Sequence, residues 1–500
     1  MTALRSAAFS SLIACLAAAP AAAQVTPEQV WAFWQGMASG TGTEMTATSQ
    51  RRDGARLVLE GVQATMLTDT AAMRAPLGTV VMRDRGDGTV EITLEPAFDI
   101  SMTITEPDSE PVEMAVTVEQ DGYVVIVSGT PEAPTYDVSA ESLTVGVSSP
   151  LVGGKEMPMD MTLALGGLKG TTSLTTGTPM GIVYDLTTGA MELLVTAENP
   201  EGDGTFELAM GAEALSARFD GTLPDGLAPG AELSEAMAAG LGGRGGYATG
   251  PMEFAFDMTD KGETTSVSGA ADGSTVDIGL SPAGLSYQVG VTGLGLVMAG
   301  STIPFPELTA SVGEYTLGLT MPLLKSATPS DFGLLMRVVD LALPEAAWGM
   351  VDPGATLPRD PATLILDTTG KATLFRDLTA ADAPEGEAPG QVEEVTINAL
   401  QLKAAGADLT GTGAFVFDNT DMETFPGMPR PTGSADLMLA GGNTLLDRLV
   451  ALGLVPQDQV FMARMMMAMF ARPGAGPDTL ISKIEITPEG QILANGQRIQ

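Results

Sequence analysis

Carboxylates are the only abundant side chains of this chain that could carry out chemistry. The 500 residues contain 62 Asp and Glu, no His and a single Cys, Cys15. Serine–histidine–acid triads, cysteine–histidine nucleophiles and histidine or thiolate zinc sites need side chains that the chain lacks. The chemistries left are paired carboxylates, as in glycoside hydrolases, a serine–lysine dyad, and an oxygen-ligated calcium or magnesium ion.

Two pairs of aspartates come closest to the spacing of metal ligands. Asp84 and Asp87 lie in RDRGDGTVEI, and Asp418 and Asp421 lie in VFDNTDMETF. Neither pair follows the D-x-[DN]-x-[DN]-G order of a calcium-binding loop. Both segments are typical of turns, so we predict no metal site. No residue is singled out as catalytic or cofactor-binding.

Two short motifs resemble functional signatures and lack the context that would support them. GLGGRG (Gly240 to Gly245) matches G-x-G-x-x-G, but its glycines follow a predicted helix and lead into a strand, the reverse of a dinucleotide-binding turn. LDTTG (Leu366 to Gly370) has one residue more than the D-[ST]-G turn of aspartic proteases and has no second copy. We therefore expect a linker at the first motif and no cofactor.

The charge balance argues against polyanionic partners. Lys and Arg number 24, which gives a formal net charge of -38. Such a chain repels nucleic acid and cannot dock on anionic headgroups through a basic patch. We interpret the acidity as a source of solubility.

The N-terminal segment resembles a secretory leader. Arg5 precedes a small-residue apolar run, and Ala21 to Ala23 form an A-x-A cleavage site before Gln24. We predict cleavage between Ala23 and Gln24 and export to the periplasm. The alternative is a lipoprotein signal, because Leu12 to Cys15 fits a lipobox. No later segment has the roughly 18 consecutive apolar residues of a transmembrane helix, so no transmembrane span is expected in the mature chain.

The pattern of the remaining chain indicates a mainly β fold. Short segments alternate apolar and polar residues between Gly-, Pro- and Asp-rich turns, which is typical of antiparallel hairpins. We predict extended antiparallel sheets, meander-like or sandwich-like. The clearest strands are expected at 55–66, 88–94, 99–105, 113–119, 123–129, 142–148, 362–375 and 392–418.

Helices are predicted at a few places only. A short N-terminal helix begins after Thr26, with Trp31 and Trp34 among its residues, and is expected to plug the end of a β core. A mid-chain helix is predicted over Ser330 to Leu343, and a C-terminal helical hairpin over 444–471. The hairpin's second helix contains FMARMMMAMF, whose methionines we assign to a core, with an adaptable ligand surface as the alternative.

The best internal boundary is the Gly- and Pro-rich stretch from Pro224 to Gly246. It divides the chain after the leader (1–23) into an N-terminal β-rich region, 24–235, and a C-terminal β-rich region, 236–500. One elongated sheet running through both regions is an equally good interpretation.

Three segments carry a family resemblance: VTPEQVWAFWQ (Val25 to Gln35), RDRGDGTVEITLEP (Arg83 to Pro96) and LPRDPATLILDTTG (Leu357 to Gly370). With these segments the chain resembles the exported bacterial proteins of domain-of-unknown-function family 2125 over most of its length. The family implies no activity, cofactor or site residue. The C-terminal layout is also similar to AsmA-like envelope proteins, a resemblance that implies extended sheets with lipid-accommodating grooves.

These observations favour a non-enzymatic periplasmic protein. Its β-rich surface or groove would serve an apolar ligand, such as a lipid, or an envelope partner. The alternative is a structural or assembly module of the cell envelope that works by edge-strand pairing. A carboxylate-based hydrolase is a third hypothesis and requires two carboxylates about 5 to 10 Å apart in a cleft. With only 3 Trp, 6 Tyr and 15 Phe, the chain has little material for a sugar-binding cleft.

Overall fold

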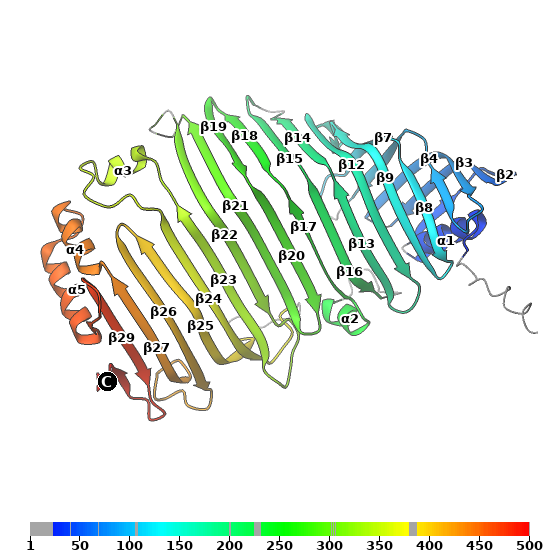
Figure 1. Cartoon of the computed structure of the whole chain (residues 1–500). Helices are drawn as coiled ribbons and strands as arrows, with labels where there is room; N and C mark the ends of the chain where they lie inside the picture. The colour runs from blue at the N-terminus through cyan, green and yellow to red at the C-terminus, as the bar shows by residue number, and fades with distance from the viewer. Residues whose placement is uncertain are drawn as a thin grey trace, which may run out of the picture. The chain divides into compact units, whose positions relative to one another are not determined.

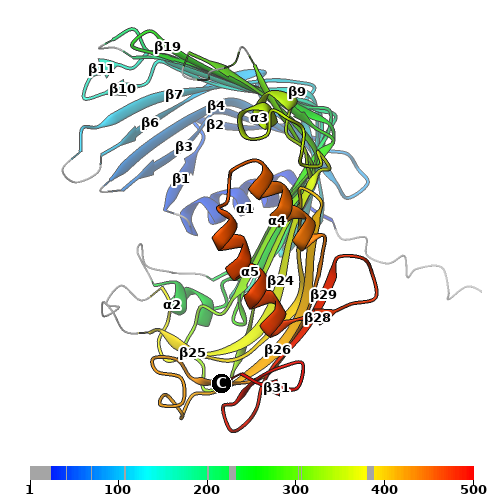
Figure 2. The same cartoon turned by 90° about the vertical axis from the view of Figure 1, so that its left-hand side faces the viewer.

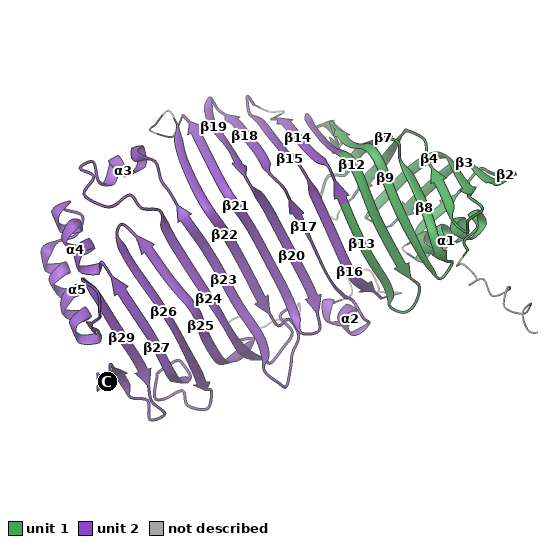
Figure 3. Ribbon diagram, in the orientation of Figure 1, with its two compact units in different colours: residues 1–156, 166–186 green, residues 157–165, 187–500 purple. Residues whose placement is uncertain are grey.

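The chain forms two compact units in a computed structural model. The structure describes residues 24–40, 42–68, 70–105, 109–199, 202–224, 232–301, 303, 305, 307–379 and 388–499. Unit 1 comprises residues up to Glu156 together with Gly166–Leu186, and unit 2 comprises Met157–Leu165 and Thr187–Gln500 (Figure 3). The predicted leader, Cys15 and the cleavage site at Ala23 lie outside the described residues, whereas Gln24 is described and exposed.

Unit 1 is an antiparallel sheet with a closed hydrophobic core (Figure 1). Helix α1 (Pro27–Gly40) packs against β1, β3 and β4, and its Val30 and Trp31 are buried with Leu59, Val80 and Ile92 of the strands. The strands of this unit, before the two that it shares with unit 2, are β1 (Thr43–Thr46), β2 (Ser49–Asp53), β3 (Arg56–Leu67), β4 (Ala71–Asp84), β5 (Val90–Thr93), β6 (Ala97–Ile104), β7 (Val112–Asp121), β8 (Val124–Thr130), β9 (Ala133–Ser148), β10 (Leu151–Val152) and β11 (Lys155–Glu156).

The predicted N-terminal helix is confirmed, with one difference in its buried face. The i, i+3, i+4, i+7 spacing of Val30, Phe33, Trp34 and Met37 predicts that these residues face inward. In the structure Trp31 is the tryptophan that is nearly inaccessible to solvent, while Trp34 is only partly buried. Both tryptophans of α1 thus contribute to the core, and Trp31 contributes the larger buried area.

Unit 2 is a long succession of antiparallel strands. The shared strands β12 (Met159–Thr175) and β13 (Met180–Thr188) connect the two units along the chain. The other strands are β14 (Ala190–Glu198), β15 (Thr205–Ala212), β16 (Leu215–Leu223), β17 (Gly242–Thr249), β18 (Met252–Asp260), β19 (Glu263–Ala271), β20 (Gly273–Ser281), β21 (Gly284–Gly300), β22 (Leu308–Met321), β23 (Ser330–Leu341), β24 (Ala362–Leu374), β25 (Gly390–Ala404), β26 (Ala407–Asp418), β27 (Arg430–Ala440), β28 (Arg472–Pro473), β29 (Thr479–Ile486), β30 (Ile492–Ala494) and β31 (Gln497–Arg498).

The strand order in unit 2 is that of a meander with one fork. The successions β14–β15–β18–β19 and β16–β17–β20 both end on β21, which pairs with β20 through its first half and with β19 through its second half. Gly293 lies between the halves with φ +61°, a conformation that favours glycine. From β21 the order continues β22–β23–β24–β25–β26–β27–β29.

The helices of unit 2 lie between or beyond its strands. They are α2 (Leu233–Ala238), α3 (Glu345–Val351), α4 (Gly442–Ala451) and α5 (Gln457–Phe470). Helices α4 and α5 contact each other beyond β29 (Figures 1 and 2), which confirms the predicted helical hairpin. Gly453, with φ +71°, follows α4 as a cap residue. Within the described ranges, no helix combines the length and the apolar character needed to cross a membrane.

The prediction of a helix over Ser330 to Leu343 is wrong, because β23 (Ser330–Leu341) occupies this segment. The segment contains Phe332, Leu335, Met336 and Val339 at helical spacing. The same residues also fit a strand that carries apolar side chains on both faces. Pairing with β22 on one side and β24 on the other satisfies its backbone in the extended form. Tertiary context therefore overrides the local period.

The stretch from Pro224 to Gly246 interrupts the strands without ending the sheet. It contains α2, as the sequence indicated. The strands on either side of it, β16 and β17, pair with each other from Leu215↔Thr249 to Thr222↔Gly242. Both strands belong to unit 2.

Candidate functional site

One face of the sheet from β17 to β29 carries a continuous apolar surface. In an antiparallel pair, directly opposite residues point to the same face, so the register identifies which side chains form a row across the strands. Tyr247 opposes Val276, Val276 opposes Val289, and the row continues through Leu317. We call this surface the apolar face; its first row consists of Tyr247, Val276, Val289, Leu317, Met336, Leu366, Leu400, Gly411 and Leu437.

The neighbouring row, two residues along each strand, has the same character. It passes from Ile278 through Tyr287, Leu319 and Leu334 and reaches Ile397 on β25. Only Thr368, on β24, interrupts its apolar run with a polar side chain. Residues that alternate with these rows are largely polar, such as Asp277 and Gln288 on the opposite face. The sheet in this part of unit 2 thus has one apolar face and one polar face, as is typical of a sheet that buries one of its faces.

The apolar face is not closed by a second layer. The side chains of both rows are half-buried or exposed, and Ile278 is 47% exposed. Leu402, two residues beyond Leu400 on β25 and therefore on the same face, is 50% exposed. In unit 1, by contrast, Leu59 and Val127 are completely buried. A sheet normally buries its apolar face against another element. Unit 2 leaves this face available to a ligand or partner.

The methionine-rich helix is a second exposed apolar surface. We expected its methionines to fill a core, and this is wrong, because Val460 is the one buried residue of α5. Helix α5 stands at the end of the sheet (Figure 1), where little of its circumference meets other elements. The α5 stripe, defined by its exposed large residues, consists of Phe461, Met462, Met465, Met466, Met469 and Phe470.

The aspartate pairs form turns. Asp84 accepts a hydrogen bond from the N–H of Gly86, and Asp87 accepts two from the N–H and hydroxyl of Thr89. These bonds within two residues are typical of Asx turns. The Thr89 hydroxyl and N–H hold the pKa of Asp87 below its usual value.

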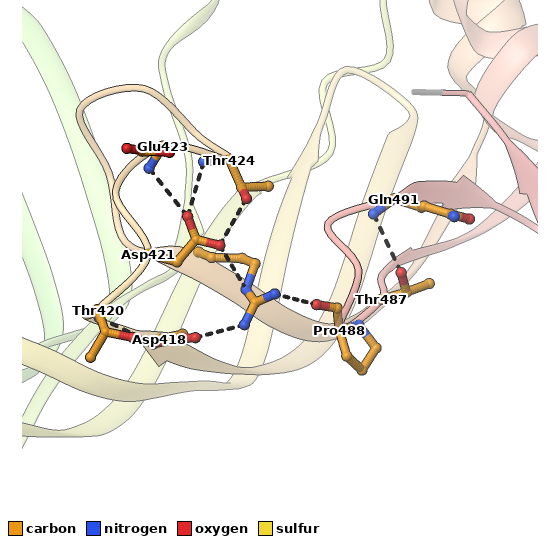
Figure 4. A network of polar contacts seen from close by, with 9 residues as sticks. Asp418, Thr420, Asp421, Glu423, Thr424, Thr487, Pro488 and Gln491 are labelled. Atoms are coloured by element: carbon orange, nitrogen blue, oxygen red, sulfur yellow. Dashed lines mark hydrogen bonds and ion pairs between the residues drawn. The ribbon is translucent and has the colours of Figure 1, made fainter.

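The second pair surrounds an arginine (Figure 4). Arg430 donates from Nη2 to Oδ2 of Asp418 at 2.6 Å, and its Nε lies 3.4 Å from Oδ2 of Asp421. The pKa of Asp418 is lowered first by bonds from Thr420 and then by Arg430, and that of Asp421 first by bonds from Thr424. The guanidinium thus supplies the positive charge that a metal would bring. Across the described part of the chain, no three acidic residues gather as metal ligands.

The two short motifs, GLGGRG and LDTTG, lie at the start of a strand and within a strand. The glycines of GLGGRG lead from α2 into β17, where Gly243 and Gly245 pair with β16 and β20. LDTTG lies inside β24 and pairs on both sides. Neither segment forms a loop open to a ligand.

One buried polar cluster was not singled out from the sequence. The side chain of Asp352 is fully buried, and it accepts hydrogen bonds from the N–H groups of Thr356 and Leu357 and from Arg359. Burial alone would raise the pKa of Asp352, but these bonds lower it below its usual value. Arg359 also stacks on Trp348, 4.7 Å from the ring centroid. Every oxygen of the carboxylate is engaged, so we assign the cluster to holding the α3 loop.

The comparisons with known proteins support the family resemblance. Residues 246–487 match the family described as "Uncharacterized protein conserved in bacteria (DUF2125)". The segment LPRDPATLILDTTG falls inside this match, whereas the two N-terminal segments fall outside it. No curated protein and no solved structure matches the chain. Residues 246–487, which include most of the apolar face, therefore belong to this bacterial family of uncharacterised proteins.

Proposed function

We propose that the protein is a non-enzymatic binder of apolar ligands, such as lipid chains, and that it works in the periplasm after removal of its leader. The observation that carries this proposal is the apolar face of unit 2, which spans the strands from β17 to β29 without a covering layer. Removing such a surface from water is favourable by about 25 cal/mol per Å². A lipid chain laid across the strands would provide that burial.

The experiment is native mass spectrometry of the protein purified from its cell envelope fraction, with lipid extraction. We expect a co-purifying apolar molecule that the double variant I278S/L402S loses. The matched control is V416S/M438S, because Val416 and Met438, 58% and 44% exposed, lie on the opposite face. No bound molecule in the wild type, or equal loss from both variants, would refute the proposal.

The alternative, a structural or assembly module of the envelope, is favoured by the α5 stripe. Six large apolar side chains on one helix form a surface suited to a partner helix. Crosslinking in cells separates the two functions. A defined protein partner captured through Met465 or Met466, without bound lipid, supports the assembly module.

A further inference from the structure

A groove lies in unit 2 beside the apolar face described above, on the same side of the sheet but over other strands. It is an open groove of about 1080 Å³ that crosses β12, β14, β15, β18, β19, β21 and β22. These strands form the other arm of the fork that ends on β21. The groove therefore runs across the strands and not along them.

The spacing of its lining residues identifies the face on which the groove lies. On β12 the groove is lined by Thr162 and Ala164 but not by the residue between them, so the groove faces the side chains at alternate positions. A Cβ atom added at Gly211 or Gly295 would meet nothing within 4 Å. At Gly269, on the other face, the ring of Phe254 already fills the space. The groove thus lies over the face of Gly211 and Gly295.

The central part of the floor of the groove consists of small residues, apart from Glu253. One row across the sheet passes from Gly211 through Glu253 and Ala270 to Gly295, and the parallel row contains Ala209, Ala255 and Ser268. Starting from Gly211, the five strands β15, β18, β19, β21 and β22 are separated by four spacings, roughly 19 Å in total. This length accepts the extended chain of a single-tailed amphiphile.

Two carboxylates flank β15 within the groove. Glu192 on β14 and Glu253 on β18 both directly oppose Gly211 on β15, so they flank an open glycine at two strand spacings, roughly 10 Å apart. Both are exposed, and neither side chain forms a hydrogen bond or ion pair with any residue in the described ranges. The groove lining contains no Lys or Arg. An unpaired negative charge thus lies on each side of a space without a side chain.

We propose that this groove binds a cationic amphiphile, with the ammonium group above Gly211 between Glu192 and Glu253 and the alkyl chain over Ala255, Ala270 and Gly295. Charge complementarity determines which headgroup binds, because two carboxylates attract an ammonium group and repel a sulfate or phosphate group of the same size. The small-residue floor selects a chain thin enough to lie in the groove. The groove adjoins the apolar face on the same side of the sheet, but its two carboxylates and its floor lie on strands of the other arm, so its binding can be tested independently.

The test is isothermal titration calorimetry with three amphiphiles that share a dodecyl chain, each kept below its micelle concentration. We expect dodecyltrimethylammonium to bind more tightly than dodecyl maltoside, and dodecyl sulfate to bind most weakly. The double variant E192Q/E253Q should weaken binding of the cation about tenfold, since each exposed ion pair contributes up to about 1 kcal/mol. Binding of dodecyl maltoside should change little.

The matched control is E207Q/D257N. Glu207 and Asp257 oppose each other on β15 and β18, on the same face and outside the groove, so this variant removes the same charge from the protein. A second variant, Gly295→Phe, fills the floor and leaves both carboxylates in place. We expect it to weaken all chain-dependent binding to the groove at least tenfold while thermal unfolding stays close to that of the wild type.

Three results would overturn the proposal: the same affinity for the three amphiphiles, equal weakening by E192Q/E253Q and E207Q/D257N, or full binding by Gly295→Phe. The I278S/L402S variant keeps the two functions apart. It should leave dodecyltrimethylammonium binding unchanged even if it abolishes co-purification of an apolar ligand.

Discussion

Nη1 of Arg359 lies 2.9 Å from Oδ2 of Asp352, whose side chain is completely excluded from solvent. The same guanidinium donates from Nη2 to the backbone carbonyl of Asp352 and stacks on Trp348. Without Arg359, the buried carboxylate would keep only the N–H bonds from Thr356 and Leu357 to offset its desolvation. The pair therefore fixes the loop after α3 to the start of β24.

We predict that Arg359→Leu lowers the melting temperature by several degrees, because it leaves the Asp352 carboxylate buried and unpaired. Arg359→Lys should recover only part of the loss, since an ammonium group cannot make both hydrogen bonds and the stacking contact at once. Differential scanning calorimetry measures both variants. Melting temperatures equal to that of the wild type would show that the cluster does not stabilise the loop.

Alternation along the strands was sufficient to predict the mainly β fold. The strand expected over 55–66 corresponds to β3 (Arg56–Leu67), and that over 362–375 to β24 (Ala362–Leu374). The local pattern gave the wrong prediction for β23, because its apolar residues fit both helical spacing and the alternation of a strand. Pairing with β22 and β24 makes the segment a strand. Short apolar segments of this kind cannot be assigned by periodicity alone.

The candidate sites could not be predicted to the same extent. Alternating residues mark an apolar face, but the same sequence pattern arises whether a second layer covers that face or not. The exposure of Ile278 and Leu402 therefore emerges only from the tertiary structure. Likewise, Glu192 and Glu253 are 61 residues apart, and only the register through Gly211 brings them together.

The pair of aspartates around Arg430 predicts a pH-dependent contribution to stability. Hydrogen bonds lower the folded-state pKa values of Asp418 and Asp421, so the stabilisation is fully present above the unfolded value of about 3.9 and is lost as the pH falls through the folded values. D418N/D421N keeps oxygen acceptors for Thr420 and Thr424 but removes the charges. We expect the variant to melt below the wild type near neutral pH.

The difference between the two proteins, measured by thermal unfolding, should shrink as the pH falls from about 6 to about 3. Comparing them at each pH cancels the titration of the other acidic residues. D84N serves as the control, since Asp84 makes a turn without a cationic partner in the described structure. A difference that is independent of pH would contradict the proposed ion pairs.

The α5 stripe predicts rapid oxidation of methionine without loss of the fold. Met462, Met466 and Met469 are more than half exposed, so hydrogen peroxide should convert them to sulfoxides while the protein remains folded. Peptide mass spectrometry during a peroxide time course measures the rates, and circular dichroism checks the fold. The control is Met82 of unit 1, which is completely buried and should react only after unfolding. Similar rates for Met82 and Met466 would contradict the exposure of this helix.

The difference between the two units predicts opposite responses to the same type of substitution. Leu59 is completely buried in the core of unit 1, so Leu59→Ala removes packed atoms and leaves a cavity, at a cost of about 2 to 5 kcal/mol in unfolding free energy. Leu402 is half exposed on the apolar face, and Leu402→Ala should cost less than about 1 kcal/mol. Denaturant unfolding followed by probes in each unit measures both values. If Leu402→Ala destabilised unit 2 as much as Leu59→Ala destabilises unit 1, the apolar face would be a folding core and not a surface kept open for a ligand.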